Sequence, residues 1–152
     1  MNYEEVKISA KRRYEQALKE IELCKEIADK ITPSLPDGWD CRIDETIFNL
    51  YITKGLHSLA SADAGEFKLV CKLVESATGV KLKKRAEAVY SENRLYSLGA
   101  DKYVTRNGVC TGVNVTLYHP ENMPDCKIEW KRRWTKEAII SDECLGISQG
   151  TS

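Results

Sequence analysis

One long amphipathic helix constrains this chain more than any other feature of its sequence. Small or apolar residues recur at alternating steps of four and three positions, at Ala10, Tyr14, Ala17, Ile21, Cys24, Ala28 and Ile31. This spacing predicts a helix with a narrow apolar seam over about three heptads. Because proline cannot continue a helix, Pro33 should end it, and residues 32–38 are predicted to form a loop.

Two interpretations of this seam remain open. The helix can pack along the sheet of its own domain, or it can pair with its copy in a second chain. A helix of about 28 residues is roughly 40 Å long, which is more than a small sheet can cover. We therefore expect a homo-oligomer formed through the N-terminal helix.

After the loop, the apolar pattern changes to a period of two, which is typical of strands. Residues 39–54 alternate on both sides of a short polar stretch and are predicted to form a hairpin. Asn107-Gly108 is the dipeptide of a tight type I′ turn, and an alternating run follows it from Val109 to Leu117. Gly112 within that run indicates a bulge or a close approach by another group. Two further strands are predicted, at residues 126–134 and 138–140.

A second helix is predicted between these strands. Asp63 followed by Glu66 forms a capping-box pattern at its start, and Gly79 is suited to its end. Its apolar face consists of Phe67, Val70, Cys71, Val74 and Ala77. Such a face predicts that the helix lies across the sheet.

These elements together define the expected fold. Residues 80–98 fit either an edge strand or a short helix over about 85–89. The chain is predicted to be α+β, with one antiparallel sheet of about 4–6 strands packed against two helices, the N-terminal one long. We expect a single domain over residues 1–145 and a flexible tail over residues 146–152.

Composition and charge limit the partners that the protein is expected to bind and the cellular compartment in which it is expected to lie. The 23 basic and 23 acidic residues cancel, so no net field attracts the chain to nucleic acid or to a membrane. No apolar run approaches the roughly 20 residues that span a bilayer, and the first residues do not resemble a secretory signal. We expect a cytoplasmic protein without a membrane partner, in which the six cysteines are buried free thiols.

Most catalytic chemistries lack the residues that they need. The sequence has two histidines, His57 and His119, and no glycine-rich phosphate loop. Its cysteines form no CxxC pair, so a structural zinc site is not predicted. We therefore predict no catalytic residue, metal or cofactor, while an enzymatic activity stays an open question.

Binding is the function that remains. Arginine and aromatic side chains suit phosphates and bases, and the predicted ligand-binding residues are Arg85, Arg94, Arg106, Tyr118, Arg132 and Trp134. The same residue types also build ordinary half-buried strands and protect sheet edges. In residues 126–134, CKIEWKRRW, the period of two places Arg132 alone among the basic residues on the face of Trp130 and Trp134.

Our hypothesis is a non-catalytic cytosolic binding or interaction protein. Small domains of this composition occur among phage and mobile-element accessory proteins, and the expected ligand is a nucleotide-like molecule or a host protein. The alternative is a nucleic-acid-binding module. It would use basic residues of the C-terminal half, namely Lys81, Lys83, Lys84, Arg85, Lys131, Arg132 and Arg133.

Overall fold

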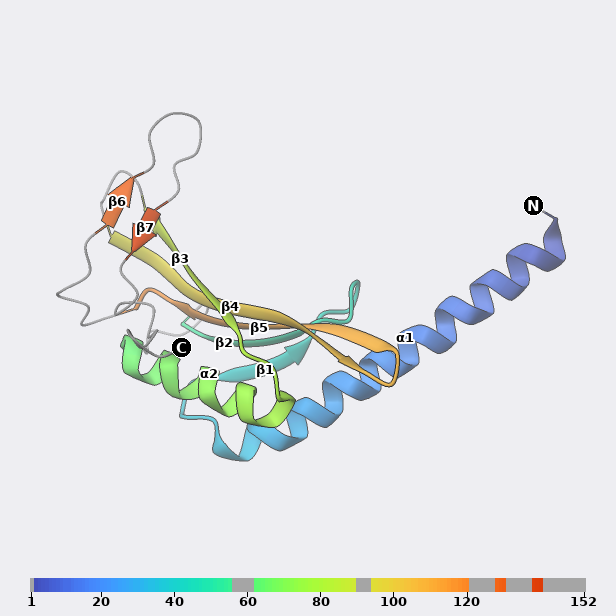
Figure 1. The fold of residues 1–152 in the computed structure, drawn as a ribbon, viewed down its shortest axis with the longest axis horizontal. Coiled ribbons are helices and arrows are strands. Elements are labelled where there is room, and N and C mark those ends of the chain that lie inside the picture. The colour runs from blue at the N-terminus through green and yellow to red at the C-terminus, as the bar shows by residue number, and fades with distance from the viewer. Residues whose placement is uncertain (1, 56–61, 90–93, 121–127, 131–137, 141–152) are drawn as a thin grey trace.

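Two helices and a five-stranded sheet form the largest part of the structure, a computed structural model that describes residues 2–55, 62–89, 94–120, 128–130 and 138–140. The elements are α1 (Tyr3–Ile31), the 3-10 turn η1 (Thr32–Ser34), β1 (Asp40–Ile43), β2 (Leu50–Lys54), α2 (Ala64–Thr78), β3 (Lys83–Val89), β4 (Arg94–Arg106), β5 (Val109–Tyr118), β6 (Ile128–Trp130) and β7 (Ala138–Ile140). Both helices lie on the same side of the sheet (Figure 1). The predicted α+β class is confirmed.

The sheet is mixed, with strand order β1-β2-β5-β4-β3. The prediction of an antiparallel sheet is therefore wrong at one pair, because β2 and β5 run parallel. Helix α2 carries the chain from β2 to the far edge, where β3 begins. The pairs β3–β4 and β4–β5 are antiparallel, so β3 and β5 run in the same direction. This is also the direction of β2, beside which β5 lies.

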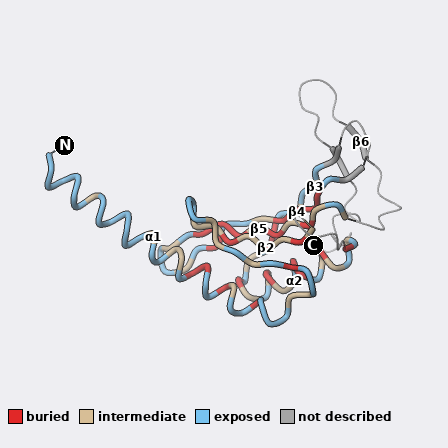
Figure 2. The backbone as a smooth tube through the Cα atoms, turned by 180° about the vertical axis from the view of Figure 1, so that it is seen from behind, coloured by how far each residue is buried: buried red, intermediate tan, exposed pale blue. Residues whose placement is uncertain are grey.

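Helix α1 begins at Tyr3, where Asn2 and Glu5 form a reciprocal capping box, and it ends before Pro33 as predicted. Its buried residues are confined to the C-terminal part, namely Leu23, Cys24, Ile27 and Ile31. Figure 2 shows that the N-terminal part projects beyond the sheet and is exposed. The predicted seam is thus divided, since Cys24 and Ile31 join the core while Ala10 and Tyr14 face solvent.

Helix α2 has the caps and the buried face that the sequence predicted, and the segment after it contains an edge strand. Asp63 caps α2 by accepting a hydrogen bond from the Glu66 N–H, and Gly79 ends it with a φ of 75°. Its buried face contains Phe67, Val70, Cys71 and Val74, as predicted. Of the two alternatives for residues 80–98, the edge strand is confirmed over Lys83–Val89, since β3 pairs with β4 at the edge of the sheet.

Strand alternation separates the two faces of the sheet. Thr111, Val113, Val115 and Leu117 of β5 are buried on the side of the helices. The alternate residues, which include Gly112 and Asn114, lie on the side turned away from α1 and α2, here named the outer face. Asn107 and Gly108 both have positive φ, as the predicted turn requires.

A second sheet consists of β6 and β7, which pair antiparallel. The strand predicted at 126–134 is present over Ile128–Trp130, and its other residues lie outside the described ones. The strand predicted at 138–140 is β7. The predicted tail, residues 146–152, also lies outside the described residues. None of the helices in the described part is long and apolar enough to cross a membrane.

A buried ion pair joins the end of β2 to the start of α2. The Lys54 side chain is 7% exposed, and its Nζ lies 2.8 Å from Oε1 of Glu66. The indole N–H of Trp39 donates to the same oxygen at 2.6 Å. A single carboxylate thus holds a lysine and a tryptophan from two other segments.

The described cysteines differ in exposure. Cys24 and Cys71 are buried, Cys41 is half-buried, and Cys110 is exposed on β5, so the expectation that all are buried is wrong at Cys110. Cys110 belongs to the polar side of the alternating strand, which explains its exposure. Cys126 and Cys144 lie outside the described residues.

Selective alkylation should distinguish these thiols. Burial raises the pKa of Cys71 to about 12 and that of Cys41 to about 11, and it also raises the pKa of Cys24. Because the thiolate is the reactive form, iodoacetamide at about pH 8 should modify Cys110 in the native protein, and Cys24, Cys41 and Cys71 only after unfolding. Peptide mapping by mass spectrometry measures each site. Equal native labelling of Cys71 and Cys110 would contradict the assigned burial.

Candidate functional site

Of the six predicted ligand-binding residues, the three with described side chains, Arg85, Arg106 and Tyr118, do not lie together at one place. Arg85 and Tyr118 share the outer face, whereas Arg106 lies at the opposite end of β4 and contacts the helices. Arg94 is the first residue of β4, and its side chain is not among the described ones. Arg132 and Trp134 lie outside the described residues.

Arg106 connects the sheet to both helices. One guanidinium nitrogen donates to Oε1 of Glu26 in α1 at 2.5 Å, and the other donates to the Ala77 carbonyl in α2 at 3.2 Å. These contacts use two of the five guanidinium N–H donors. Arg106 thus links the sheet to α1 and α2, and its predicted role in ligand binding stays a prediction.

Arg85 forms an ion pair with Asp101 across the outer face. Its side chain passes over Gly99, where an added Cβ would lie 3.3 Å from the guanidinium Nε. The absence of a side chain at Gly99 therefore makes room for Arg85. Both partners remain partly exposed, with side-chain exposures of 47% and 39%.

An aromatic cluster marks one end of the outer face. The Tyr96 ring packs edge-on against Tyr118, with 5.8 Å between centroids, and against His119, with 5.2 Å. The backbone N–H of His119 also donates to the Tyr96 carbonyl at 2.7 Å. Tyr118 thus holds a packed position beside a pair of partly exposed rings.

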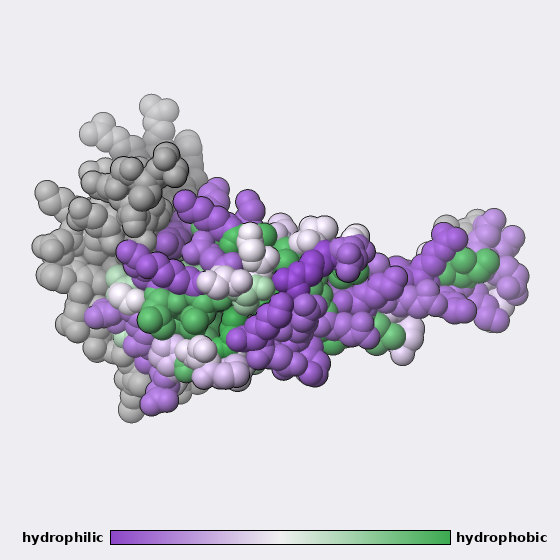
Figure 3. All heavy atoms as spheres, turned by 60° about the horizontal axis from the view of Figure 1, so that its bottom comes forward, coloured by the Kyte–Doolittle hydropathy of each residue, from purple (hydrophilic) through white to green (hydrophobic). Residues whose placement is uncertain are grey.

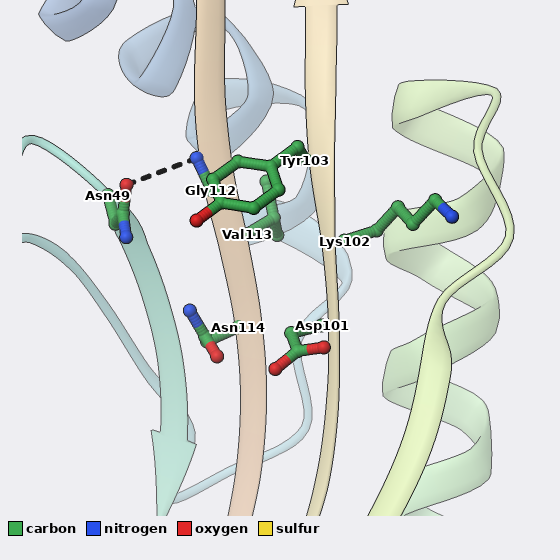
Figure 4. A pocket seen from close by; sticks show the side chains of 7 residues that line it. All are labelled: Asn49, Asp101, Lys102, Tyr103, Gly112, Val113 and Asn114. Carbon is green, nitrogen blue, oxygen red and sulfur yellow. Dashed lines mark hydrogen bonds between the residues drawn. The ribbon is translucent and has the colours of Figure 1, made fainter.

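A small hollow lies further along the same face. It has a volume of about 130 Å³ and is lined by Asn49, Asp101, Lys102, Tyr103, Gly112, Val113 and Asn114. Figure 4 shows that Tyr103, Asn49, Asn114 and Asp101 surround it, while the Lys102 side chain points away from the other labelled side chains. Gly112 is at its floor, on β5.

Gly112 allows the Asn49 side chain to lie against β5. The Asn49 Oδ1 accepts a hydrogen bond from the Gly112 N–H at 3.1 Å (Figure 4). A Cβ on Gly112 would lie 2.9 Å from both Cγ and Nδ2 of Asn49, closer than real Cβ contacts. The predicted close approach at Gly112 is confirmed, and the approaching group is the Asn49 carboxamide.

Tyr103 supplies the aromatic wall of the hollow. It is the cross-strand partner of Gly112, and it reaches toward β5 while remaining 71% exposed. A tyrosine opposite a glycine covers exposed backbone, which stabilises a sheet. An exposed ring is also a surface on which a planar ligand can stack.

The charges balance among the outer-face strand residues whose side chains the structure describes. Three of these residues are basic and three are acidic, namely Arg42, Lys83 and Arg85 with Asp40, Glu87 and Asp101. Asp101, the carboxylate nearest the hollow, is paired with Arg85. The hollow therefore offers hydrogen bonds and stacking without a net charge.

Sequence reasoning found Gly112 but did not select the residues around it. Asn49, Asp101, Tyr103 and Asn114 come from three strands or their ends, and only the strand register brings them together. The signal present in the sequence was a glycine on the polar side of an alternating strand. Its neighbours depended on the unexpected parallel pairing of β2 with β5.

Within the described residues, no three or more His, Cys, Asp or Glu side chains are grouped so that they could hold a metal ion. Comparisons with protein-family models, with curated proteins and with solved structures give no match. The function of this α+β protein must therefore be inferred from its own geometry.

Proposed function

We propose that the protein is a non-catalytic, cytoplasmic binding protein that acts as a homo-oligomer and holds a planar, uncharged ligand group of the nucleobase type in the outer-face hollow. The observation that carries this proposal is the exposed Tyr103 ring beside two asparagine carboxamides over a glycine floor. Stacking and paired amide hydrogen bonds are the two interactions that a nucleobase offers.

The carboxamides provide the polar part of recognition. The Asn49 Oδ1 is held by the Gly112 N–H, so its Nδ2 group remains the donor available to a ligand. Asn114 is half-buried on the neighbouring strand and carries both a donor and an acceptor. An asparagine side chain can pair with the donor–acceptor edge of a base, as it does with adenine.

The charge distribution favours a small neutral group over a polyanion. Of the basic residues that a nucleic-acid interface would use, Lys83 and Arg85 lie on the outer face, and Lys84 alternates to the side of the helices. Arg85 is already paired with Asp101. The basic stretch is therefore divided between two faces.

Nucleoside titration tests the proposal. We expect adenosine, cytidine, guanosine or uridine to bind with a dissociation constant on the order of 1 mM, because the hollow contacts only one ring. Chemical shifts of the Gly112 amide and the Asn49 side-chain amide should move, whereas inorganic phosphate should leave them unchanged. Tyr103→Leu should weaken binding about tenfold through lost stacking, and Tyr103→Phe should retain it.

Leu69→Ala is the control, since Leu69 is 50% exposed on α2, which lies on the other side of the sheet from the hollow and outside α1. It should bind nucleosides as the unmodified protein does. Absence of binding by all four nucleosides at several times the expected dissociation constant would reject the proposed function. Binding that requires an oligonucleotide and falls steeply with salt would instead support a nucleic-acid interface.

A further inference from the structure

The N-terminal half of α1 exposes apolar side chains that the described part of the chain does not cover. Tyr3, Val6, Tyr14 and Leu18 are 75%, 47%, 65% and 43% exposed. Leu23 is the first buried residue of the helix, so the stretch from Tyr3 to Glu22 extends about 30 Å before the core begins. Figure 3 shows apolar side chains at the outer end of this helix, beyond a largely polar stretch.

Tyr3, Val6 and Tyr14 belong to a stripe of small and apolar residues that is distinct from the face that packs on the sheet. At about 100° per residue, Tyr3, Val6, Ala10, Tyr14, Ala17 and Ile21 cluster around one direction. The buried residues Leu23, Cys24, Ile27 and Ile31 cluster about 90° away. A straight helix drifts by roughly 20° per heptad from a 3.5-residue repeat, which explains why the two ends of the seam face differently.

We propose that residues 3–14 of α1 pair antiparallel with the same residues of a second copy of this chain. A self-complementary patch of this kind gives a closed dimer with two-fold symmetry, in which each contact occurs twice. Two features indicate that the partner is a second copy of this chain. The tyrosines of two antiparallel copies lie side by side, and opposite charges lie next to the stripe. This inference is independent of the proposed ligand site, which lies on the opposite face of the sheet from the helices.

In the antiparallel register, tyrosines pack at both ends of the paired segment, and smaller contacts lie between them. Tyr3 of one copy lies level with Tyr14 of the other, and Lys7 lies level with Ala10. The small Ala10 lets the helices approach, while the Lys7 stem covers it and the ammonium remains in water. The Lys7 Nζ already lies 6.0 Å from the Tyr3 ring centroid, on the same side of the helix.

Charge complementarity selects this orientation. Glu4 and Lys11 lie on the same flank of the stripe, at about 100° and 80° from Tyr3 around the helix. Antiparallel pairing brings Glu4 of each copy near Lys11 of the other. A parallel pair in register would instead place Glu4 level with Glu4 and Lys11 level with Lys11, so that these opposite charges would not be paired.

Analytical ultracentrifugation tests the interface. We expect a species of twice the 17.2 kDa monomer mass, with a dissociation constant on the order of 10 µM because the paired segments bury less than a standard interface. Tyr14→Glu should weaken association at least about tenfold. The control is Ile8→Glu, since Ile8 is 53% exposed on the side of the helix away from the stripe, and it should associate normally.

A charge exchange tests the orientation. Glu4→Lys and Lys11→Glu should each dimerise about tenfold more weakly, because every flanking pair becomes repulsive. An equimolar mixture of the two variants should recover dimerisation, since each copy then faces opposite charges. A monomer at a concentration several times the expected dissociation constant would overturn the proposal and leave the stripe to a partner of another sequence. Failure of the mixture to recover would overturn the antiparallel register.

Discussion

Glu66→Ala is expected to lower the free energy of unfolding by about 3 kcal/mol. The change leaves the Lys54 ammonium, which is 7% exposed, without its carboxylate, and it leaves the Trp39 indole N–H without its acceptor. The value is placed at the low end for a broken buried pair because the Glu66 side chain is 27% exposed. Urea unfolding followed by tryptophan fluorescence and circular dichroism gives the measurement.

The control is Lys72→Ala, since Lys72 is exposed on the same helix and should change stability by less than about 0.5 kcal/mol. The double variant Lys54→Met/Glu66→Leu should recover the part of the loss that comes from the unpaired Lys54 charge, while the Trp39 indole N–H still lacks its acceptor. If Glu66→Ala and Lys72→Ala unfolded at the same urea concentration, the buried pair would not support the fold as described.

Glu66 also shows where sequence reasoning stops. The spacing of Asp63 and Glu66 predicted a capping box, and the half that depends on Asp63 is present. The Glu66 carboxylate instead binds Lys54 and Trp39, which precede it in the sequence by 12 and 27 residues. A local spacing can predict the start of a helix, but the choice of a distant partner depends on the tertiary arrangement.

The same distinction applies to the fold. Period-two alternation predicted the strands, and the buried series Thr111, Val113, Val115 and Leu117 confirms the alternating run predicted for β5. Alternation carries no information on which strand becomes the neighbour. The parallel pairing of β2 with β5 arises because α2 carries the chain to the opposite edge of the sheet, where β3 begins. No local sequence pattern predicts this pairing.

At the candidate site, the sequence again predicted a local feature but not the distant residues that contact it. Gly112 was identifiable because a glycine within an alternating strand indicates a close approach. Its partner Asn49 was not, since 63 residues separate them. Arg85 and Arg106 were selected for their chemistry, and the structure pairs them with Asp101 and Glu26. Residue type alone could not predict these partners, because each ion pair joins segments that are distant in the sequence.

Gly55→Ala is expected to destabilise the protein by about 3 kcal/mol, through backbone strain and a steric clash together. Gly55 follows β2 with a φ of +93°, a conformation that an L-residue adopts only with strain. An added Cβ would lie 2.7 Å from the Tyr118 carbonyl oxygen at the end of β5. Because that atom belongs to the backbone, the clash can be relieved only by moving the ends of two paired strands.

Gly79→Ala separates the two contributions. Gly79 also has positive φ, at +75°, but an added Cβ there would meet nothing within 4 Å. This variant should therefore show the strain alone, about 1–2 kcal/mol, and should unfold at a higher urea concentration than Gly55→Ala. Equal losses in the two variants would show that the β2 and β5 ends yield freely at Tyr118. A larger loss for Gly55→Ala would establish that their close approach is fixed by backbone packing.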